Sequence, residues 1–404
     1  MAPTTRRLIF WLSAPVVAFS IVGGLLSRVT AREGAPYQEL KIFNDVVGLI
    51  GSNYVEKADI DRVMRGAMDG LADSLDPDSA YLSKEQVKQI ESGAVLPPGE
   101  VGLDLTRQYY LRVIAARDGS PAAKAGLQTG DFIRAIDGKP TREMSVWEGM
   151  RALRGPVGTK VSLTIFRGSA NDPHDIGLTR ELLAGPEVTG RSAAPGVGYL
   201  RVIAVGARAA EQTRAQIADL TKHGATSLIV DVRRTSGGSL DAGIAMARLF
   251  VPSGTLAVRD TKGAPQETIA ARPGDGTVTL PVTILVDSGT SSAAELFAAA
   301  LVDNKRAELI GEHTLGRASA QRLIRLPDGS GLYLTTTRYL TPSGTPLHEK
   351  GLAPAVPVDQ QAAGSHLARP LHRHVDLLVE AGEGAVQPVG PFGQGTPQDV
   401  PFVE

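Results

Sequence analysis

Cysteine is absent from this sequence of 404 residues, and several kinds of chemistry are absent with it. Disulfides, iron–sulfur clusters, zinc–thiolate sites and cysteine nucleophiles are all excluded. Aromatic residues make up only 5% of the chain, and 42 lysines and arginines are balanced by 43 aspartates and glutamates. Because neither a strong basic field nor interleaved stacking side chains are available, we expect no nucleic-acid partner. His366, His372 and His374 form only a weak metal-binding pattern, so we expect no metal and no cofactor.

What the sequence does contain indicates a folded, multidomain chain. Apolar residues account for 42% and charged residues for 21%, which is ample material for buried cores. The length suggests roughly two to three domains. By pattern we divide the chain into an export segment (1–31), a helical region (32–94), a region of short strands (95–170), an α/β domain (171–359) and a C-terminal helix with a mobile tail (360–404).

Residues 1–31 predict export from the cytoplasm. Arg6 and Arg7 precede an apolar run of 19 residues from Leu8 to Leu26. This run is longer than a typical signal-peptide core and just long enough to span a membrane. Val29-Thr30-Ala31 has the small-residue spacing of a cleavage site. A cleaved signal peptide and an inner-membrane anchor both remain open, and both place the later residues in the periplasm or another extracytoplasmic space.

Residues 32–94 predict helices. Apolar residues recur at three- and four-residue steps from Leu40 to Tyr54 and again from Val63 to Leu75. The second helix should stop at Leu75–Ser79, because a residue that precedes proline is disfavoured in a helix. Ser83–Gln86 reads as a capping box that opens a third helix. We interpret this region as a module for packing or for assembly of a homo-oligomer.

The region 95–170 resembles a PDZ domain. The resemblance is carried by an ordered set of short motifs: VGL at 101–103, SPAA at 120–123, AGL at 125–127, GDFI at 130–133 and IDG at 136–138. A PDZ domain binds peptides by adding a strand to its sheet. On this resemblance Val101, Gly102 and Leu103 cradle a terminal carboxylate, and glycine lets backbone amides converge on an anion. A PDZ fold that serves only as a spacer is the alternative.

From residue 196 onward the pattern is α/β. Buried strands are predicted over 226–233 and 280–286, and helices near 209–223 and 240–250. Further strands late in the chain predict a mixed sheet flanked by helices. A short helix is expected at about 374–381. We therefore assign the chain to the mixed, multidomain α/β class.

Ser292 is the candidate nucleophile on local grounds. A buried strand ends at Val286, and Thr290-Ser291-Ser292 opens a helix. A hydroxyl at this position lies at the positive end of the helix dipole, where backbone amides face a developing negative charge. The alternative is equally physical, because Ser292 and Glu295 have the spacing of a capping box that only begins the helix.

Taken together, the motifs resemble the carboxy-terminal processing, or tail-specific, serine peptidases over nearly all of the mature chain. This family combines a helical N-terminal part, a PDZ domain and an α/β peptidase domain. The motifs that match are LDPDSAYL at 75–82, GYLRV at 198–202, DVRRTSGGSLD at 231–241, VDSGTSSAAEL at 286–296, GEHTLGRASAQ at 311–321 and LTTTRYLTPSG at 334–344.

The resemblance implies roles for individual residues. Ser292 takes the nucleophile position, and the backbone amides of Gly237 and Ala293 take the position of the oxyanion hole. Gln321 matches the residue that orients the base. The base position itself, a lysine in the family, is Arg317 here. A guanidinium stays protonated and cannot accept the serine proton, so His313 is an alternative base.

Two functions follow from this resemblance. The first is an exported serine endopeptidase that binds protein C-termini through its PDZ domain and cleaves through an acyl-enzyme at Ser292. The second is a catalytically impaired pseudopeptidase that binds or scaffolds C-terminal tails, because Arg317 replaces the basic lysine. In both cases the partners are proteins or peptides with accessible C-termini, and the inner membrane if the N-terminal segment is retained.

Overall fold

The computed structural model describes residues 38–168 and 172–358, which divide into two compact units at the Leu75–Asp76 boundary. The predicted export segment and the predicted helix at 374–381 lie outside the described residues. Within the described ranges, no helix is both long and apolar enough to cross a bilayer.

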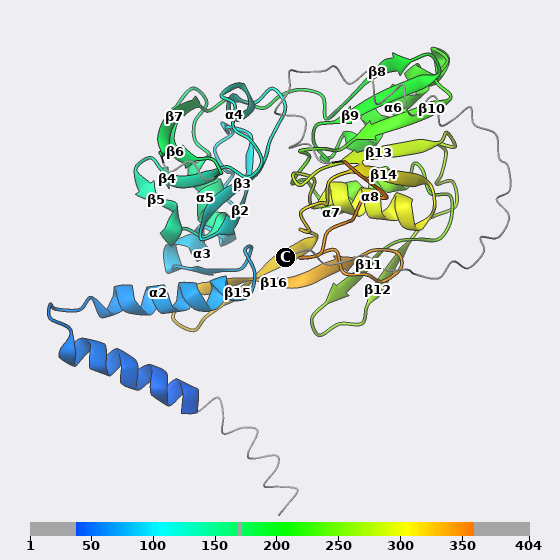
Figure 1. The fold of residues 1–404 in the computed structure, drawn as a ribbon. Helices are drawn as coiled ribbons and strands as arrows, with labels where there is room; N and C mark the ends of the chain where they lie inside the picture. Colours follow the sequence, from blue (N-terminus) through cyan, green and yellow to red (C-terminus); the bar gives the residue numbers. More distant parts are fainter. Residues whose placement is uncertain (1–37, 169–171, 359–404) are drawn as a thin grey trace, which may run out of the picture. The chain divides into compact units, whose positions relative to one another are not determined.

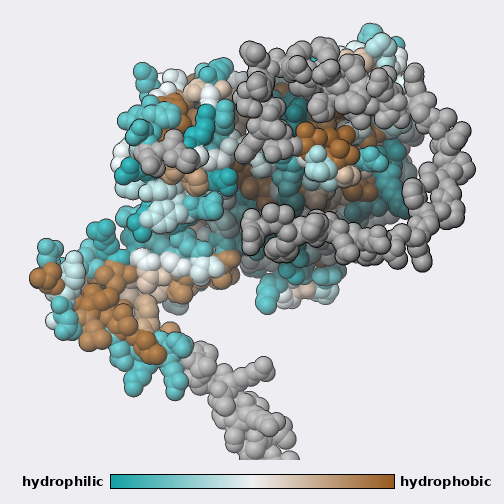
Figure 2. All heavy atoms as spheres, in the orientation of Figure 1, coloured by the Kyte–Doolittle hydropathy of each residue, from teal (hydrophilic) through white to brown (hydrophobic). Residues whose placement is uncertain are grey.

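The first unit contains two helices, as the periodicity predicted: one over 38–53 and α2 (Ile60–Asp73). Asp59 begins α2 by accepting a hydrogen bond from the Arg62 amide at 3.1 Å. Both helices keep apolar side chains exposed, among them Leu40, Leu49 and Leu71. Figure 2 shows these side chains as an apolar surface along the two helices. The apolar side chains of each helix are therefore not buried by contacts within this unit.

The second unit begins with β1 (Ala80–Leu82) and α3 (Lys84–Glu91). The predicted capping box is present: Ser83 Oγ accepts from the Gln86 amide, and Gln86 Oε1 accepts from the Ser83 amide. β1 pairs with a late strand, β16 (Gly331–Leu340), so residues 80–82 belong to a sheet and not to a helical region. Three residues are too few for a strand period to show in the sequence.

The PDZ domain is a sheet with strand order β2-β3-β4-β6-β7, in which β2 forms one edge (Figure 1). β7 continues this sheet beyond residue 170, where we expected the domain to end. Helix α5 packs beside the edge strand β2. The elements are β2 (Leu103–Gln108), β3 (Tyr110–Ala116), α4 (Pro121–Lys124), β4 (Phe132–Ile136), β5 (Lys139–Pro140), α5 (Val146–Ala152), β6 (Lys160–Phe166) and β7 (His174–Thr179).

The α/β domain is built on a six-stranded mixed sheet with strand order β17-β14-β13-β10-β9-β8. Its pairings are parallel except for β8 with β9. The elements are β8 (Val188–Ala194), β9 (Val197–Val202), α6 (Ala209–Lys222), β10 (Ser227–Asp231), α7 (Leu240–Ala247), β13 (Val282–Val286), α8 (Ala293–Asp303), β14 (Ala307–Gly311) and β17 (Val356–Pro357).

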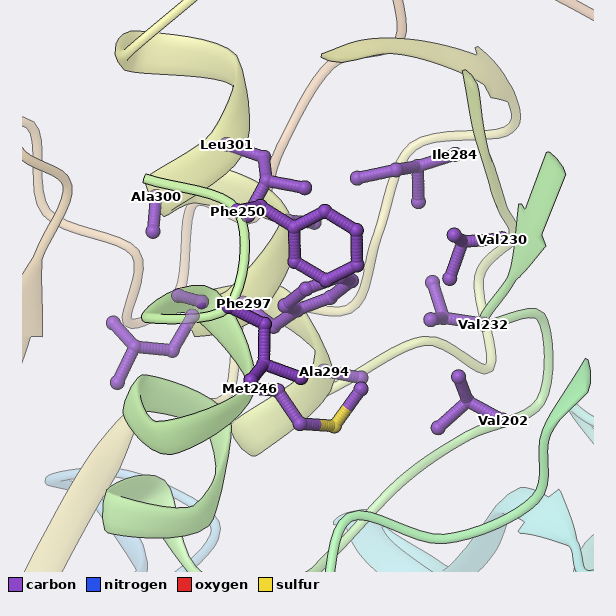
Figure 3. Packing of buried hydrophobic residues seen from close by; sticks show 14 of the residues in the cluster. Val202, Val230, Val232, Met246, Phe250, Ile284, Ala294, Phe297, Ala300 and Leu301 are labelled. Atoms are coloured by element: carbon purple, nitrogen blue, oxygen red, sulfur yellow. The ribbon is translucent and has the colours of Figure 1, made fainter. Parts of the chain in front are cut away.

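Helices α7 and α8 pack against this sheet through a buried apolar core (Figure 3). The rings of Phe250 and Phe297 meet edge to face with centroids 5.7 Å apart, and Met246 is fully buried beside them. Aromatic pairs of this kind add about 0.5–1.5 kcal/mol beyond their buried area. The core fixes the start of α8, where Ser292 stands.

The remaining strands form a separate antiparallel sheet with order β1-β16-β11-β12 and β15 paired to β16. We had expected the late strands to complete the mixed sheet. β14 and β17 do so, but β16 does not: it forms a hairpin with β15 (Ser319–Arg325) and also pairs with β11 (Thr255–Thr261), which pairs with β12 (Glu267–Ala270). An antiparallel sheet tolerates one wet face, which suits the partly exposed side chains of β15 and β16.

Candidate active site

Ser292 has an unusual backbone conformation for a residue that bears a side chain. Its φ is 58° and its ψ is −120°, immediately before α8 begins at Ala293. Such a conformation costs of order 1–3 kcal/mol and persists only where the surroundings impose it. The preceding loop does so, because the Ser291 amide donates to the Thr235 carbonyl at 3.0 Å. α7 closes from the other side: a Cβ on Gly243 would lie 2.4 Å from the Ala293 carbonyl oxygen.

The carboxylate of Glu295 connects Ser292 to the segment that holds the predicted base position. Glu295 is fully buried and accepts hydrogen bonds from the amides of Ser292 (3.0 Å), Gly316 (2.6 Å) and Arg317 (2.8 Å). The Thr314 hydroxyl donates to it as well. Burial raises the pKa of the Glu295 carboxyl, and these donors oppose that rise. The Glu295 half of the expected capping box is therefore present, and it also reaches residue 317.

The guanidinium of Arg317 is bound to Asp78 and not to Glu295. Nε and Nη2 lie 2.9 Å and 2.6 Å from the two carboxylate oxygens of Asp78. Nη1 donates to the carbonyl of Leu105, on the edge strand β2, at 3.0 Å. The Asp78 side chain is only 6% exposed. One hydrogen bond, from Nε to Oδ2 of Asp78, and the close charge contact of Nη2 with Oδ1 hold the guanidinium against this buried carboxylate.

The predicted oxyanion loop is shaped by two glycines. Gly237 and Gly238 have φ of 70° and 82°, and a Cβ on Gly238 would lie 2.2 Å from the Val205 carbonyl oxygen. An acidic residue of β2, Asp104, lies against this loop: Ser236 Oγ donates to its carboxylate at 2.6 Å. A Cβ on Gly237 would lie 3.1 Å from Asp104 Oδ1. A negative charge therefore stands next to the predicted oxyanion donor.

Our sequence reasoning missed Asp78 and Asp104 as site residues. Asp78 lies within the LDPDSAYL motif, where the carboxylate itself was not assigned a partner. Asp104 interrupts the apolar run VGLDL of a strand beside the predicted peptide cradle. A charged residue inside an apolar strand is the feature of the sequence that could have identified Asp104 as a site residue.

Gln321 lines the same cavity as Arg317, whereas no contact within the described part of the chain joins His313 to Ser292. The Gln321 amide donates to the hydroxyls of Ser319 and Thr335, each at 3.1 Å. Gln321, Arg317 and Asp78 nevertheless line one cavity of about 240 Å³. His313 is exposed, and its Nδ1 lies 2.8 Å from its neighbour's carbonyl oxygen. Among the contacts of the described residues, none joins the His313 ring to Ser292.

The predicted carboxylate cradle of the PDZ domain requires its glycine for a second reason. Gly102 has φ of 76°, and a Cβ there would lie 2.3 Å from the Cβ of Ser120, the residue that begins α4. The carbonyls of Val101 and Gly102 accept from the amides of Ala122 and Arg117 at 3.0 Å and 2.8 Å. The loop is thus held tightly against the start of α4.

Comparison with known proteins agrees with this architecture. The family model "Peptidase family S41" matches residues 196–358, and a PDZ domain model matches residues 112–167. A carboxy-terminal-processing protease of Bartonella bacilliformis is 32% identical over 363 residues, covering 88% of this chain and 83% of the relative. The chain therefore belongs to the carboxy-terminal processing proteases of peptidase family S41 and carries a PDZ domain.

Two further relatives show how far the similarity extends. A carboxyl-terminal-processing protease of Synechocystis sp. is 33% identical over 388 residues, which covers 89% of each chain. Among solved structures, the photosystem II D1 C-terminal processing protease superposes with a TM-score of 0.64 at 26% identity, covering 80% of this chain and 93% of that one. The fold of this chain is thus that of a carboxy-terminal processing protease.

Proposed function

We propose that this chain binds extended protein C-termini through its PDZ domain and holds them at a Ser292 centre that lacks a proton acceptor. The observation that carries the proposal is the ion pair between Arg317 and Asp78. Guanidinium groups keep their proton at any working pH, so residue 317 cannot activate the serine hydroxyl. Under this proposal the protein is a tail-binding pseudopeptidase outside the cytoplasm.

The rest of the centre has the parts that acyl transfer uses. Ser292 stands at the start of a helix, and the amides of Ala293 and Gly237 are the donors that would receive a tetrahedral oxyanion. Attack on a peptide carbonyl requires that the serine proton leave as the new bond forms. Without a group to take that proton, a bound peptide stays intact.

An active exported serine endopeptidase is the second candidate. The strained backbone of Ser292 favours it, because strain of this kind is concentrated at functional centres. This candidate needs a base other than residue 317, and His313 is the residue we assign to that role. It differs from the first candidate in one measurable respect, serine-dependent cleavage by the unaltered chain.

The test is cleavage of an unstructured reporter with an apolar C-terminus. We expect the unaltered chain and Ser292→Ala to be indistinguishable, and Arg317→Lys to gain about 100-fold or more, because a general base contributes about 10²–10⁴-fold. A lysine facing Asp78 is held partly in its charged form by that carboxylate. Arg317→Lys with Asp78→Asn should therefore exceed Arg317→Lys alone.

The matched control is Arg338→Lys, because Arg338 also pairs with an aspartate, Asp260, on the same antiparallel sheet. It should leave cleavage at background. Serine-dependent cleavage by the unaltered chain that is lost in His313→Ala would establish the second candidate. Lysine variants that fold and bind tails but do not cleave would show that the centre lacks more than its base.

A further inference from the structure

The cavity beside Arg317 is lined in part by the PDZ helix α5. Its lining includes Trp147, Met150 and Arg151 from α5 and Arg154 just after the helix, together with Asp78 and Arg317. Its volume is about 240 Å³. That is room for one side chain of a bound peptide.

Three guanidinium groups line this cavity, and two of them have carboxylate partners. Arg317 is paired with Asp78, and Arg154 lies 2.9 Å from Glu100. Arg151 forms no ion pair with any residue that the structure describes; its guanidinium lies 4.3 Å from the centroid of the Trp147 ring. Desolvation lowers the pKa of the Arg151 guanidinium, and repulsion by Arg154 adds to this. The wall therefore holds one uncompensated positive charge that a bound anion would stabilise.

The cavity also lies where a peptide would pass. PDZ domains add a peptide strand to an exposed sheet edge, and pockets for alternate side chains provide specificity. In this domain β2 is an edge strand and α5 packs beside it. Arg317, which lines the cavity, donates to the Leu105 carbonyl of β2. A side chain of the added strand that points towards α5 would thus face Arg151.

We propose that Arg151 makes this cavity a specificity pocket for an acidic side chain, Asp or Glu, upstream of the C-terminus of the bound peptide. The inference rests on the proposed tail binding and specifies the class of tail. An acidic side chain would receive charge-assisted hydrogen bonds from Arg151 while its stem packs against Trp147 and Met150.

Peptide affinity measured by calorimetry on the full chain tests the proposal. The probes are tails with an apolar last residue, in which one glutamate is moved through the preceding positions and compared with glutamine. Each peptide is made as a free acid and as an amide. At one position we expect glutamate to bind about 5- to 20-fold more tightly than glutamine, as a charge-assisted contact implies. Arg151→Gln should reduce that ratio to within about twofold, and Arg151→Lys, which keeps the charge but not the planar guanidinium stacked on Trp147, should retain part of it.

The matched control is Arg142→Gln. Arg142 belongs to the same domain and also lies over an aromatic ring, 4.6 Å from the centroid of Tyr109, but it does not line the cavity. It should keep the glutamate preference. A preference for glutamate over glutamine that survives Arg151→Gln, or the absence of such a preference in the unaltered chain, would overturn the inference. In either case the ratio of affinities for the free-acid and amide tails still reports whether the C-terminus is bound. If Arg151→Gln binds the free-acid and amide tails equally well, the pocket receives the terminal carboxylate instead, and the inference is overturned as well. Absence of binding by every peptide would remove the proposed function itself.

Discussion

The Glu295 carboxylate accepts hydrogen bonds from donors in two segments, the start of α8 and residues 314–317. A buried carboxylate costs much free energy unless such donors surround it. Its removal would also leave buried amides without partners, at about 1–3 kcal/mol each. At the scale of single residues, Glu295 thus holds Ser292 and Arg317 at a fixed separation through their backbones, whatever side chain residue 317 carries.

Asp104 provides a prediction at the same scale. A peptide boronate anion, RB(OH)3−, exchanges one hydroxide for the serine oxygen, and that hydroxide leaves with the serine proton as water. The negatively charged tetrahedral adduct therefore reports on the oxyanion donors without a base from the protein. The Asp104 carboxylate beside Gly237 opposes that charge. Two unit charges at 4 Å interact by about 1 kcal/mol in water, so Asp104→Asn should tighten boronate binding about fivefold or more. Asparagine can still accept from Ser236.

The control for this experiment is Asp175→Asn, because Asp175 also accepts from a hydroxyl in the PDZ sheet, that of Thr164 at 2.6 Å. It should leave boronate affinity unchanged, and Ser292→Ala should abolish adduct formation. Unchanged affinity in Asp104→Asn would show that the carboxylate does not influence the oxyanion position.

At the scale of elements, strand β2 connects the two functions that we propose. Its edge is where a peptide would be added, and the same strand supplies Asp104 to the oxyanion loop and the Leu105 carbonyl to Arg317. Each of these contacts is a hydrogen bond between the PDZ sheet and the α/β domain. Because a peptide strand needs the backbone groups of that edge, it competes directly with the contact between Arg317 and Leu105.

The loop before β2 supplies a prediction about tail binding. Gly102 and Gly119 both have φ of 76°, but only Gly102 has a neighbour in the way of a Cβ. Gly119→Ala should cost about 1 kcal/mol of unfolding free energy for its backbone strain and leave peptide affinity unchanged. Gly102→Ala should cost more, because its Cβ displaces Ser120, and should weaken binding of a free-acid tail by about tenfold or more.

Denaturant unfolding and calorimetry measure the two effects separately. Equal affinities for the acid and amide forms of a tail in the unaltered chain would support a PDZ domain that acts as a spacer. Equal effects of the two glycine variants on affinity would show that the contact between Gly102 and Ser120 does not decide binding.

At the scale of the whole molecule, the prediction that follows from Arg6, Arg7 and the apolar run from Leu8 to Leu26 is export. A reporter enzyme that requires disulfides, fused near residue 359, should be active in the full chain, because disulfides persist outside the cytoplasm. Deletion of residues 1–31 should abolish that activity and leave the fusion inside the cell. Activity of a cytoplasm-dependent reporter at the same position would contradict the prediction.

Local pattern determined much about this protein. Helical periodicity, the capping box at Ser83, the PDZ motifs and the alternation of buried strands and helices were all readable, because each depends on residues close together in the chain. The same holds for Ser292 at the start of a helix. The roles of Ser292, Gly237, Ala293 and Gln321 stay predictions, since geometry alone does not measure activity.

Only the tertiary structure decided what Arg317 contacts. Asp78 lies 239 residues earlier in the chain, and Asp104 lies 132 residues before Ser236. No periodicity or spacing links residues so far apart; their contacts depend on how β1, the PDZ sheet and the α/β domain pack. Strand β16 pairs with β1, β11 and β15 in a separate antiparallel sheet for the same reason, because strand pairing is a long-range choice that local propensity does not encode. The sequence thus determined which side chain stands at position 317, and tertiary packing decided that its guanidinium pairs with Asp78 and donates to the Leu105 carbonyl.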